Sequence, residues 1–256
     1  MGNETPEIPQ TVLPQELVAA IEHVILVGGS FDPIHAAHVK IPVEARATLP
    51  EPEWRASWLV FVPAAVSPFK VEGGADLEAD LRRATAPERA AMVKLAIGGV
   101  ERACIWTDEI DRARDEESRG LAPRPSYTIE TVRRALAARP GLRVRIMIGA
   151  DQAGSLHRWR AAHELVALSR PICVLRPPIE TAKDLRELLK ASGAWSEDEL
   201  ETLCMGAATA ALMPVSSSKI RAAIADGAEA AALCELNPVV ARKIDELGLY
   251  RRIARR

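Results

Sequence analysis

The 256-residue sequence contains only four cysteines, few aromatic residues and no strong net charge. The cysteines, Cys104, Cys173, Cys204 and Cys234, form no CxxC pair, which argues against a disulfide framework or a zinc site and favours the reducing cytoplasm. A formal net charge of −2 gives no indication of a nucleic-acid or membrane partner. No run reaches the roughly 18 apolar residues that a membrane span needs. These absences leave a globular protein of ordinary composition as the expectation.

The two ends of the chain differ in composition from the part between them. Residues 1–21 are polar and contain several prolines, and we interpret them as an N-terminal extension because they lack the pattern of a signal peptide. Residues 251–256 contain four arginines, and a solvated basic tail explains them better than a nucleic-acid-binding patch does. We therefore expect one domain over residues 22–250. The sequence leaves open whether the chain forms a homo-oligomer.

Short apolar runs alternate with helical patterns along residues 22–250. This alternation predicts an α/β fold with a doubly wound, mostly parallel sheet, because strands that are buried on both faces are apolar throughout. Ligands of such sheets bind at the carboxyl ends of the strands, where the strand order reverses. We expect strands at residues 23–27, 58–63, 103–106, 142–148, 171–175 and 210–213, and helices at 38–48, 87–97, 128–138, 156–168 and 217–225.

Two segments do not fit this alternation and are predicted to be insertions. Residues 108–125 are rich in charge and include Gly120, Pro123 and Pro125, so we expect a mobile surface loop there. Residues 177–209 contain two further helical patterns, at 182–190 and 197–204, and we expect them to cap one end of the sheet.

The first expected strand runs into a turn of unusual composition, where residues 28–38 read GGSFDPIHAAH. Two glycines after a buried strand allow a tight turn and let a phosphate approach main-chain N–H groups. His35 and His38 are three positions apart at a helix start, so they share a face and both can donate hydrogen bonds to phosphate oxygens. The turn is neither GxGxxG nor GxxxxGK[ST], which argues against a dinucleotide oxidoreductase and a P-loop enzyme. It predicts a nucleoside triphosphate site of another kind.

A second candidate phosphate site lies near the C-terminal end. Ser216, Ser217 and Ser218 precede an expected helix, and Arg221 follows within it. Serines in this position are often simple helix caps. Three hydroxyls, a helix N-terminus and a guanidinium together form an oxyanion cradle, and with the glycine turn they suggest a two-sided grip on a triphosphate. Lys70, in the loop after the second expected strand, is a further candidate for phosphate contact.

The order of these segments resembles the bacterial nicotinate-nucleotide adenylyltransferases, a family of the nucleotidyltransferase superfamily. The resemblance runs from about residue 23 to residue 250. It implies a single domain of the Rossmann-like nucleotidyltransferase fold with a helical C-terminal part, and the transfer of AMP from ATP to nicotinate mononucleotide with release of pyrophosphate. It rests on the segments at residues 28–38, 67–70 (SPFK), 126–128 (SYT), 149–151 (GAD) and 215–221 (VSSSKIR), with Arg89, Met92, Thr131, Leu156 and Trp159 between them.

The resemblance also implies roles for individual residues. Trp159 would lie beside the pyridine ring, and residues 126–128 would offer donors to the nicotinate carboxylate. Mg²⁺ would accompany ATP and bridge phosphate oxygens mostly through water, so no metal site built from protein side chains is expected. The catalytic residues would be His35, His38, Lys70 and Arg221; the ATP-binding residues Gly28, Gly29, Ser30, Phe31, Gly149, Asp151, Ser216, Ser217, Ser218 and Ile220; and the substrate-binding residues Asp32, Ser126, Tyr127, Thr128 and Trp159.

Two positions depart from the family pattern, and several interpretations stay open. Ala37 stands between the histidines, where glycine is frequent in the family, and Phe69 stands where histidine is frequent. The acceptor could be nicotinamide mononucleotide or phosphopantetheine in place of nicotinate mononucleotide. A catalytically silent nucleotide-binding homologue is an alternative of another class, because a fold does not determine a function. A nucleic-acid binder that acts through the basic tail is a third.

Overall fold

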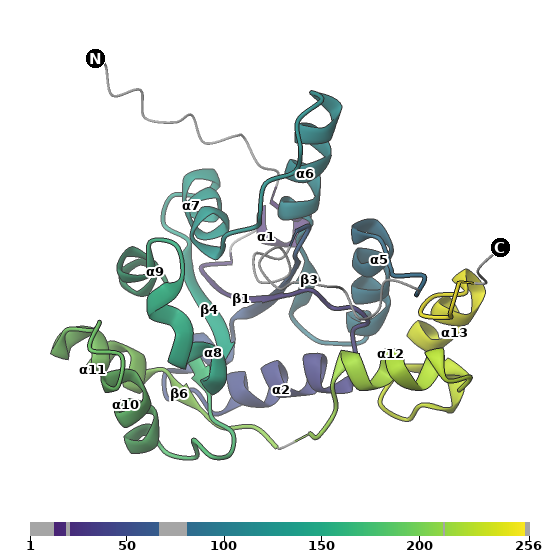
Figure 1. Cartoon of the computed structure of the whole chain (residues 1–256). Coiled ribbons are helices and arrows are strands. Elements are labelled where there is room, and N and C mark those ends of the chain that lie inside the picture. Colours follow the sequence, from purple (N-terminus) through teal and green to yellow (C-terminus); the bar gives the residue numbers. More distant parts are fainter. Residues whose placement is uncertain (1–12, 19–20, 67–80, 212, 254–256) are drawn as a thin grey trace.

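The computed structural model describes residues 13–18, 21–66, 81–211 and 213–253 (Figure 1). They form one sheet of six parallel strands in the order β3-β2-β1-β4-β5-β6. The chain builds the sheet outward from β1 to β3, returns to the centre at β4 and continues outward to β6. The strands are β1 (His23–Gly29), β2 (Trp58–Pro63), β3 (Ala103–Ile105), β4 (Arg143–Gly149), β5 (Ile172–Val174) and β6 (Ala207–Ala208).

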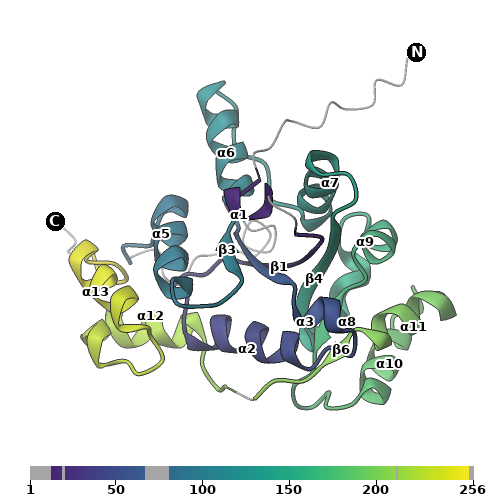
Figure 2. The ribbon, with the colours of Figure 1, turned by 180° about the vertical axis from the view of Figure 1, so that it is seen from behind.

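Helices cover both faces of the sheet, as the apolar strands predicted. Figures 1 and 2 show α7, α9, α10 and α11 gathered on one side and α5, α12 and α13 on the other. In the first half of the chain the helices are α1 (Gln15–Val18), α2 (Ala36–Ala47), α3 (Pro52–Arg55), α5 (Ala86–Ile97), α6 (Asp108–Ser118) and α7 (Thr128–Ala138). In the second half they are α8 (Ala150–Ser155), η1 (Leu156–Arg158), α9 (Ala162–Ser169), α10 (Ala182–Lys190), α11 (Glu197–Met205), α12 (Ser217–Ala225), η2 (Ala230–Ala232) and α13 (Pro238–Leu247).

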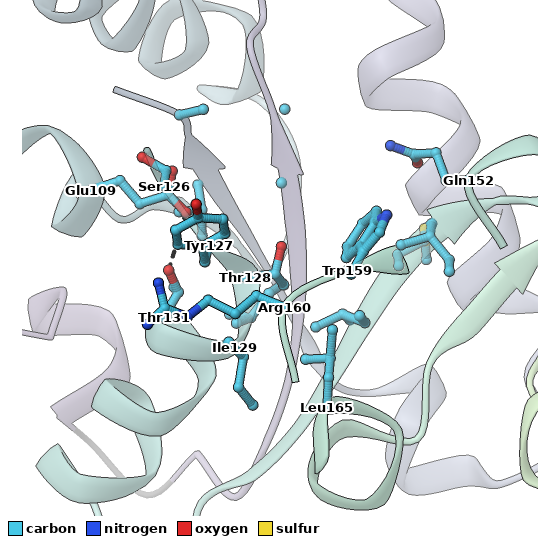
Figure 3. A pocket seen from close by; sticks show the side chains of 18 of the residues that line it. Glu109, Ser126, Tyr127, Thr128, Ile129, Thr131, Gln152, Trp159, Arg160 and Leu165 are labelled. Atoms are coloured by element: carbon cyan, nitrogen blue, oxygen red, sulfur yellow. Dashed lines mark hydrogen bonds between the residues drawn. The ribbon is translucent and has the colours of Figure 1, made fainter. Parts of the chain in front are cut away.

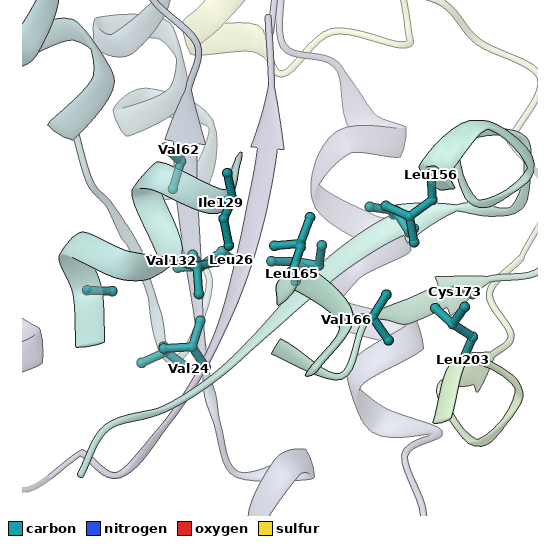
Figure 4. Close-up of a cluster of buried hydrophobic side chains, with 14 of the residues drawn as sticks. Val24, Leu26, Val62, Ile129, Val132, Leu156, Leu165, Val166, Cys173 and Leu203 are labelled. Atoms are coloured by element: carbon teal, nitrogen blue, oxygen red, sulfur yellow. The ribbon is translucent and has the colours of Figure 1, made fainter. Parts of the chain in front are cut away.

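Alternate residues of β1 belong to two separate hydrophobic cores. Val24 and Leu26 pack beneath α7 and α9, in the cluster drawn in Figure 4, whereas Ile25 and Val27 pack against α2, α5, α12 and α13. Successive side chains of a strand point to opposite faces, so one buried strand contributes to both cores. This arrangement is the α/β doubly wound sheet that the sequence predicted.

The strand order reverses between β1 and β4, which are direct neighbours. Their carboxyl ends, at Gly29 and Gly149, therefore lie next to each other at the point where helices leave toward opposite faces. Both glycine-ended strands were predicted, and the structure brings their ends together. Among the described residues no helix is long and apolar enough to span a bilayer.

Three local predictions were wrong. Residues 108–118 form the helix α6, with Asp108, Glu109, Arg112 and Glu116 buried, in place of the expected loop. Three of these four residues form ion pairs: Arg112 lies 2.9 Å from Glu116, and Asp108 pairs with Arg134 of α7. The expected strand at 210–213 is instead the short β6 three positions earlier, and the expected helix at 156–168 is divided into η1 and α9.

The two ends of the described chain pack onto the domain. In the expected N-terminal extension, Leu17 is 1% exposed in the core, and its carbonyl accepts a hydrogen bond of 2.7 Å from Arg139. At the other end, Leu81 and Arg252 form an antiparallel bridge, and the Tyr250 main-chain N–H donates to the carbonyl of Arg82. The C-terminal segment is thereby held beside the chain that precedes α5.

Candidate functional site

Two cavities meet over the carboxyl ends of β1 and β4. The first, which we call the α2 cavity, has a volume of about 470 Å³ and lies among the starts of α2 and α12 and the β4–α8 junction. The second, the α7 cavity, has a volume of about 330 Å³ and lies between the sheet, the start of α7 and the end of η1. Because the same residues form a wall of both, ligands in the two cavities would lie side by side. The shared residues are Gly28, Gly29, Ser30, Met147, Ile148 and Gln152.

The turn after β1 leaves its first glycine facing open space. A Cβ atom at Gly28 would meet nothing within 4 Å, so a ligand can approach the main chain there. At Gly29 a Cβ would lie only 3.0 Å from the ring of Phe31, which is itself buried and has a φ of 49°. The Phe31 ring packs against Phe61 and meets the edge of the His38 ring at a centroid distance of 5.2 Å. The phenylalanine thus supports the turn and one of the two histidines.

His35 and His38 stack on each other with ring centroids 3.7 Å apart, and both line the α2 cavity. The main-chain N–H of His35 donates to Nδ1 of His38 over 3.3 Å. Since that nitrogen accepts, a neutral His38 carries its proton on Nε2. The Nε2–H group of His38 is therefore a ready hydrogen-bond donor.

Burial keeps both histidines uncharged at neutral pH. It lowers the pKa of His38 to about 3, with a smaller contribution from the neighbouring His35. It also lowers the pKa of His35 to about 4, although the nearby Glu235 carboxylate partly offsets the effect. Two neutral imidazoles can donate to an anion without first losing a bound counter-ion, and an anion in the cavity would favour their protonation.

The serines near the C-terminal end begin α12 as predicted. Ser216 caps the helix by accepting from the Lys219 main-chain N–H at 3.3 Å, and Ser217 donates to the Pro33 carbonyl at 2.9 Å. Both line the α2 cavity together with His35 and His38. Ser218 does not line it and accepts a hydrogen bond from Arg221. The α12 start therefore combines two hydroxyls with a helix N-terminus in one wall of the cavity.

Arg221 and Ile220 lie behind this wall. The Arg221 guanidinium donates to the Asp32 carbonyl at 2.7 Å and to the Ser218 hydroxyl at 3.2 Å, so it links α12 to the turn after β1. Ile220 is 3% exposed and packs in the core beneath α12. Neither side chain lines either cavity.

The resemblance implied that Asp32 contacts the substrate, but in the structure other protein residues bind its carboxylate. Its carboxylate is 4% exposed, accepts from Arg83 on Oδ2 at 2.5 Å and accepts from the Tyr250 hydroxyl on Oδ1 at 2.8 Å. It lines neither cavity. We therefore assign Asp32 to the support of the turn. The sequence interpretation missed Arg83 and Tyr250, because nothing local marks them as partners of a residue so far away.

The β4 end contributes Gly149 and Asp151 to the α2 cavity. The absence of a side chain at Gly149 lets the Asp151 carboxylate lie close to the main chain, since a Cβ at Gly149 would be only 2.6 Å from that carboxylate. Asp151 pairs with Arg176 at 2.5 Å, an arginine that also lines the cavity and that the sequence interpretation did not identify. Gln152, in the wall shared by the cavities, accepts from the Gly149 N–H at 3.1 Å.

The α7 cavity contains the residues expected around an acceptor. Figure 3 shows Trp159 on one side of it and Ser126, Tyr127 and Thr131 on the other. Thr128 is the first residue of α7 and lines the cavity with Ile129. The N-cap residue Tyr127 makes no side-chain cap, so the N-terminus of the helix is part of the cavity wall. Arg160 lies over the Tyr127 ring at 4.8 Å. The cavity thus offers an aromatic face and an anion-binding helix N-terminus.

Glu109 of α6 is a further cavity residue that the sequence interpretation missed. It is 7% exposed and lines the α7 cavity beside Ser126 and Thr131. A local signal could have indicated its burial, because Ala113 follows Glu109 by four positions and so lies on the same face of a helix. Lys70 and the rest of the SPFK segment lie outside the described residues, so the role of Lys70 stays a prediction.

The chain resembles known proteins in its sequence and in its fold. A family model described as Cytidylyltransferase-like matches residues 26–223. A "Probable nicotinate-nucleotide adenylyltransferase" of Bordetella avium is 34% identical over 228 residues, which cover 88% of this chain and 96% of the relative. A protein of the same name from Stenotrophomonas maltophilia is 33% identical over 236 residues, covering 89% and 96%. The structure of Plasmodium falciparum nicotinic acid mononucleotide adenylyltransferase complexed with NaAD has a TM-score of 0.56 at 16% identity, covers 90% of this chain and 97% of its own, and thus shares the fold.

Proposed function

The chain belongs to the cytidylyltransferase-like family, and from this we propose that it transfers AMP from ATP to nicotinate mononucleotide, giving deamido-NAD and pyrophosphate. The names of relatives that it matches over nearly their whole length support this reaction. The structural observation that carries the proposal is the pair of cavities that meet at Gly28, Gly29 and Ser30. One is equipped for phosphates and the other for an aromatic ring with an anionic substituent.

ATP occupies the α2 cavity. The Nε2–H of His38 and the neighbouring His35 donate to the α-phosphate, where negative charge increases in the transition state. Ser216, Ser217 and the α12 N-terminus bind the β- and γ-phosphates from the opposite wall. Arg221 adds positive charge behind this wall, and its hydrogen bonds to Ser218 and to the Asp32 carbonyl fix the start of α12 relative to the turn after β1. Gly149 and Asp151 lie beside the nucleoside.

Nicotinate mononucleotide occupies the α7 cavity. Its pyridine ring stacks on Trp159, and its carboxylate accepts from the N–H groups and the Thr128 hydroxyl at the start of α7. Its 5′-phosphate reaches the shared wall at Gly28–Ser30. There a phosphate oxygen forms a bond to the α-phosphorus of ATP while the bond to the β-phosphate oxygen breaks and pyrophosphate leaves. Positioning and charge stabilisation supply the catalysis, and no protein nucleophile takes part.

Mg²⁺ arrives with ATP as part of the substrate. Asp151 is the one carboxylate among the described residues that line the α2 cavity, and it pairs with Arg176. Such a donor set fits an ion bound mainly through the substrate, which would supply positive charge to the phosphates. Lys70 would contact the same phosphates. We place the reaction in the cytoplasm, where cysteines that form no disulfide, like these four, persist.

The test is pyrophosphate release with ATP and a panel of three acceptors: nicotinate mononucleotide, nicotinamide mononucleotide and phosphopantetheine. We expect nicotinate mononucleotide to give the highest kcat/KM. Faster turnover with phosphopantetheine would overturn the acceptor assignment. ATP binding without pyrophosphate release from any acceptor would identify a catalytically silent homologue.

A further inference from the structure

One carboxyl group in the α7 cavity has no task in the reaction described above. Glu109 is 7% exposed, and its Oε1 accepts a hydrogen bond of 3.1 Å from the Thr131 hydroxyl. Figure 3 shows it beside Ser126 and Thr131, across the cavity from Trp159. The position is close to the start of α7, where the pyridine substituent binds in the proposed complex. A buried acid in the wall of a cavity for an anion requires an explanation.

The charged neighbours of Glu109 are engaged with other groups. On α6 itself, Asp108 pairs with Arg134 of α7, and Arg112 pairs with Glu116. Arg112 also donates to the Ser126 hydroxyl at 3.4 Å. Arg89 of α5 donates to main-chain carbonyls at the ends of β1 and β2. Among the described residues, no guanidinium or ammonium forms an ion pair with Glu109.

This environment favours the uncharged form of the carboxyl. Burial, with a smaller contribution from the Asp108 carboxylate, raises the pKa of Glu109 to about 7. Hydrogen bonds from Ser126 and Thr131 and the more distant Arg134 act in the opposite direction but do not outweigh burial. The Glu109 carboxyl therefore changes charge near neutral pH.

The two pyridine mononucleotides differ only in the group that would face this residue. A carboxylate is negative and only accepts hydrogen bonds, whereas a carboxamide is neutral and also donates. We propose that Glu109 is a specificity-determining residue of the proposed acceptor site: uncharged, it donates a hydrogen bond to the carboxylate of nicotinate mononucleotide, and ionised, it accepts from the carboxamide of nicotinamide mononucleotide. This inference rests on the proposed function, since it presumes a pyridine in the α7 cavity.

The consequence is an acceptor preference that depends on pH. As the pH rises through about 7, Glu109 ionises, repels the nicotinate carboxylate and becomes a partner for the amide. The ratio of kcat/KM for the two acceptors isolates this effect. Both acceptors carry the same ribose phosphate and meet the same His35 and His38, so titration of those groups cancels in the ratio.

The experiment supplies both acceptors together with MgATP and measures how product is divided between them at about pH 6 and about pH 8.5. The preference for the nicotinate form should fall by about tenfold or more across this range, because kcat/KM reports the ionisation of the free enzyme. If nicotinamide mononucleotide is not turned over, its inhibition constant against nicotinate mononucleotide replaces its kcat/KM. A ratio that is independent of pH in the wild-type protein overturns the inference.

Two variants separate Glu109 from its surroundings. Glu109→Gln keeps the size and the acceptor oxygen but cannot ionise, so its ratio should change less than about twofold with pH. Glu116→Gln removes another buried carboxyl of α6, one that does not line the cavity, and should retain the wild-type dependence. Equal pH dependence in Glu109→Gln and the wild type would exclude Glu109.

A measurement on the unmodified protein covers the case in which Glu109→Gln does not fold. Titration calorimetry in two buffers of different ionisation enthalpy should show proton uptake with nicotinate mononucleotide that exceeds the uptake with nicotinamide mononucleotide. Equal uptake contradicts the role of Glu109. Failure of the proposed function has a different signature, because no pyridine acceptor would then support pyrophosphate release at any pH.

Discussion

The hydroxyl of Tyr250 donates a hydrogen bond of 2.8 Å to Oδ1 of Asp32, which lies 218 positions earlier in the chain. Burial and the Asp32 carboxylate raise the pKa of Tyr250, so its hydroxyl remains a donor at any ordinary pH. Arg83 binds the second oxygen of the same carboxylate, and Arg221 binds the Asp32 carbonyl. Asp32 thus joins three distant segments to the turn that precedes His35. The C-terminal end of the fold thereby supports the phosphate site.

Tyr250→Phe removes this donor and leaves a buried carboxylate oxygen without its hydrogen bond. The free energy of unfolding should fall by about 1–3 kcal/mol, and kcat should fall about three- to tenfold because the turn loses a constraint. Urea denaturation and pyrophosphate release measure the two effects. Ser57→Ala is the matched control, since it deletes a buried hydroxyl that bonds the Trp54 carbonyl at the opposite end of the sheet. An equal loss of kcat in both variants would show that the effect is not specific to the turn.

His38→Ala removes the Nε2–H donor from the α2 cavity. We expect kcat to fall by about 10²–10³ while the melting temperature changes little, because the ring stacks on His35 and fills no closed core. His163→Ala provides the comparison: this side chain is 65% exposed, contacts Glu199 and lines neither cavity. Turnover near the wild-type value in His38→Ala would contradict the assignment of the histidine pair.

The two buried histidines should make the fold sensitive to acid. Their folded pKa values, about 4 for His35 and about 3 for His38, lie below the ordinary value of 6.5, so the unfolded chain binds more protons. The stability that they contribute is present above pH 6.5 and is lost as the pH falls toward their folded pKa values. Glu109, whose folded pKa is raised, acts in the opposite direction below about pH 7.

Comparing His38→Ala with the wild type isolates the contribution of His38 to the pH dependence of stability, because both proteins contain Glu109. Between pH 6.5 and about pH 5, His38→Ala should lose about 1–2 kcal/mol less unfolding free energy than the wild type does. Chemical denaturation at each pH gives the two curves. Parallel curves would mean that His38 is not buried in its neutral form.

Trp159 provides the aromatic face of the α7 cavity. Trp159→Leu should raise KM for nicotinate mononucleotide about tenfold and change KM for ATP less than about twofold, because only the stacking contact is lost. Trp195→Leu is the control, since Trp195 packs in the core beside α10 and α11 and lines neither cavity. If the two variants change the acceptor KM equally, general destabilisation explains the result and stacking does not.

The sequence was sufficient to predict those strands and helices whose formation depends on residues close together in the chain. The apolar runs that became β1, β2 and β4 predicted a parallel sheet, and the doubly wound fold was confirmed. The paired helices at residues 182–190 and 197–204 were also confirmed as α10 and α11. A strand or helix has its own periodicity, which a single segment of sequence displays.

Prediction failed where a side chain depends on a distant partner. The charge-dense residues 108–125 were predicted to form a mobile surface loop, yet residues 108–118 form α6. In this helix Asp108 pairs with Arg134, and Arg112 pairs with Glu116. The resemblance implied a substrate contact for Asp32, a role that stays a prediction, but no local pattern indicated that Arg83 and Tyr250 bind its carboxylate. A charge is stable when buried only if its partner is near, and that nearness is a property of the whole fold.

Glycines at the end of a central strand, two histidines at the start of the next helix and serines at the start of a helix near the C-terminus were all evident in the amino-acid sequence. Those features are local, because turn chemistry and helical spacing act over a few residues. The folded chain was needed to show that β1 and β4 are neighbours, that two cavities share the wall at Gly28–Ser30 and that Glu109 lines one of them. These relationships depend on strand order and helix packing, which bring together residues that no local pattern connects.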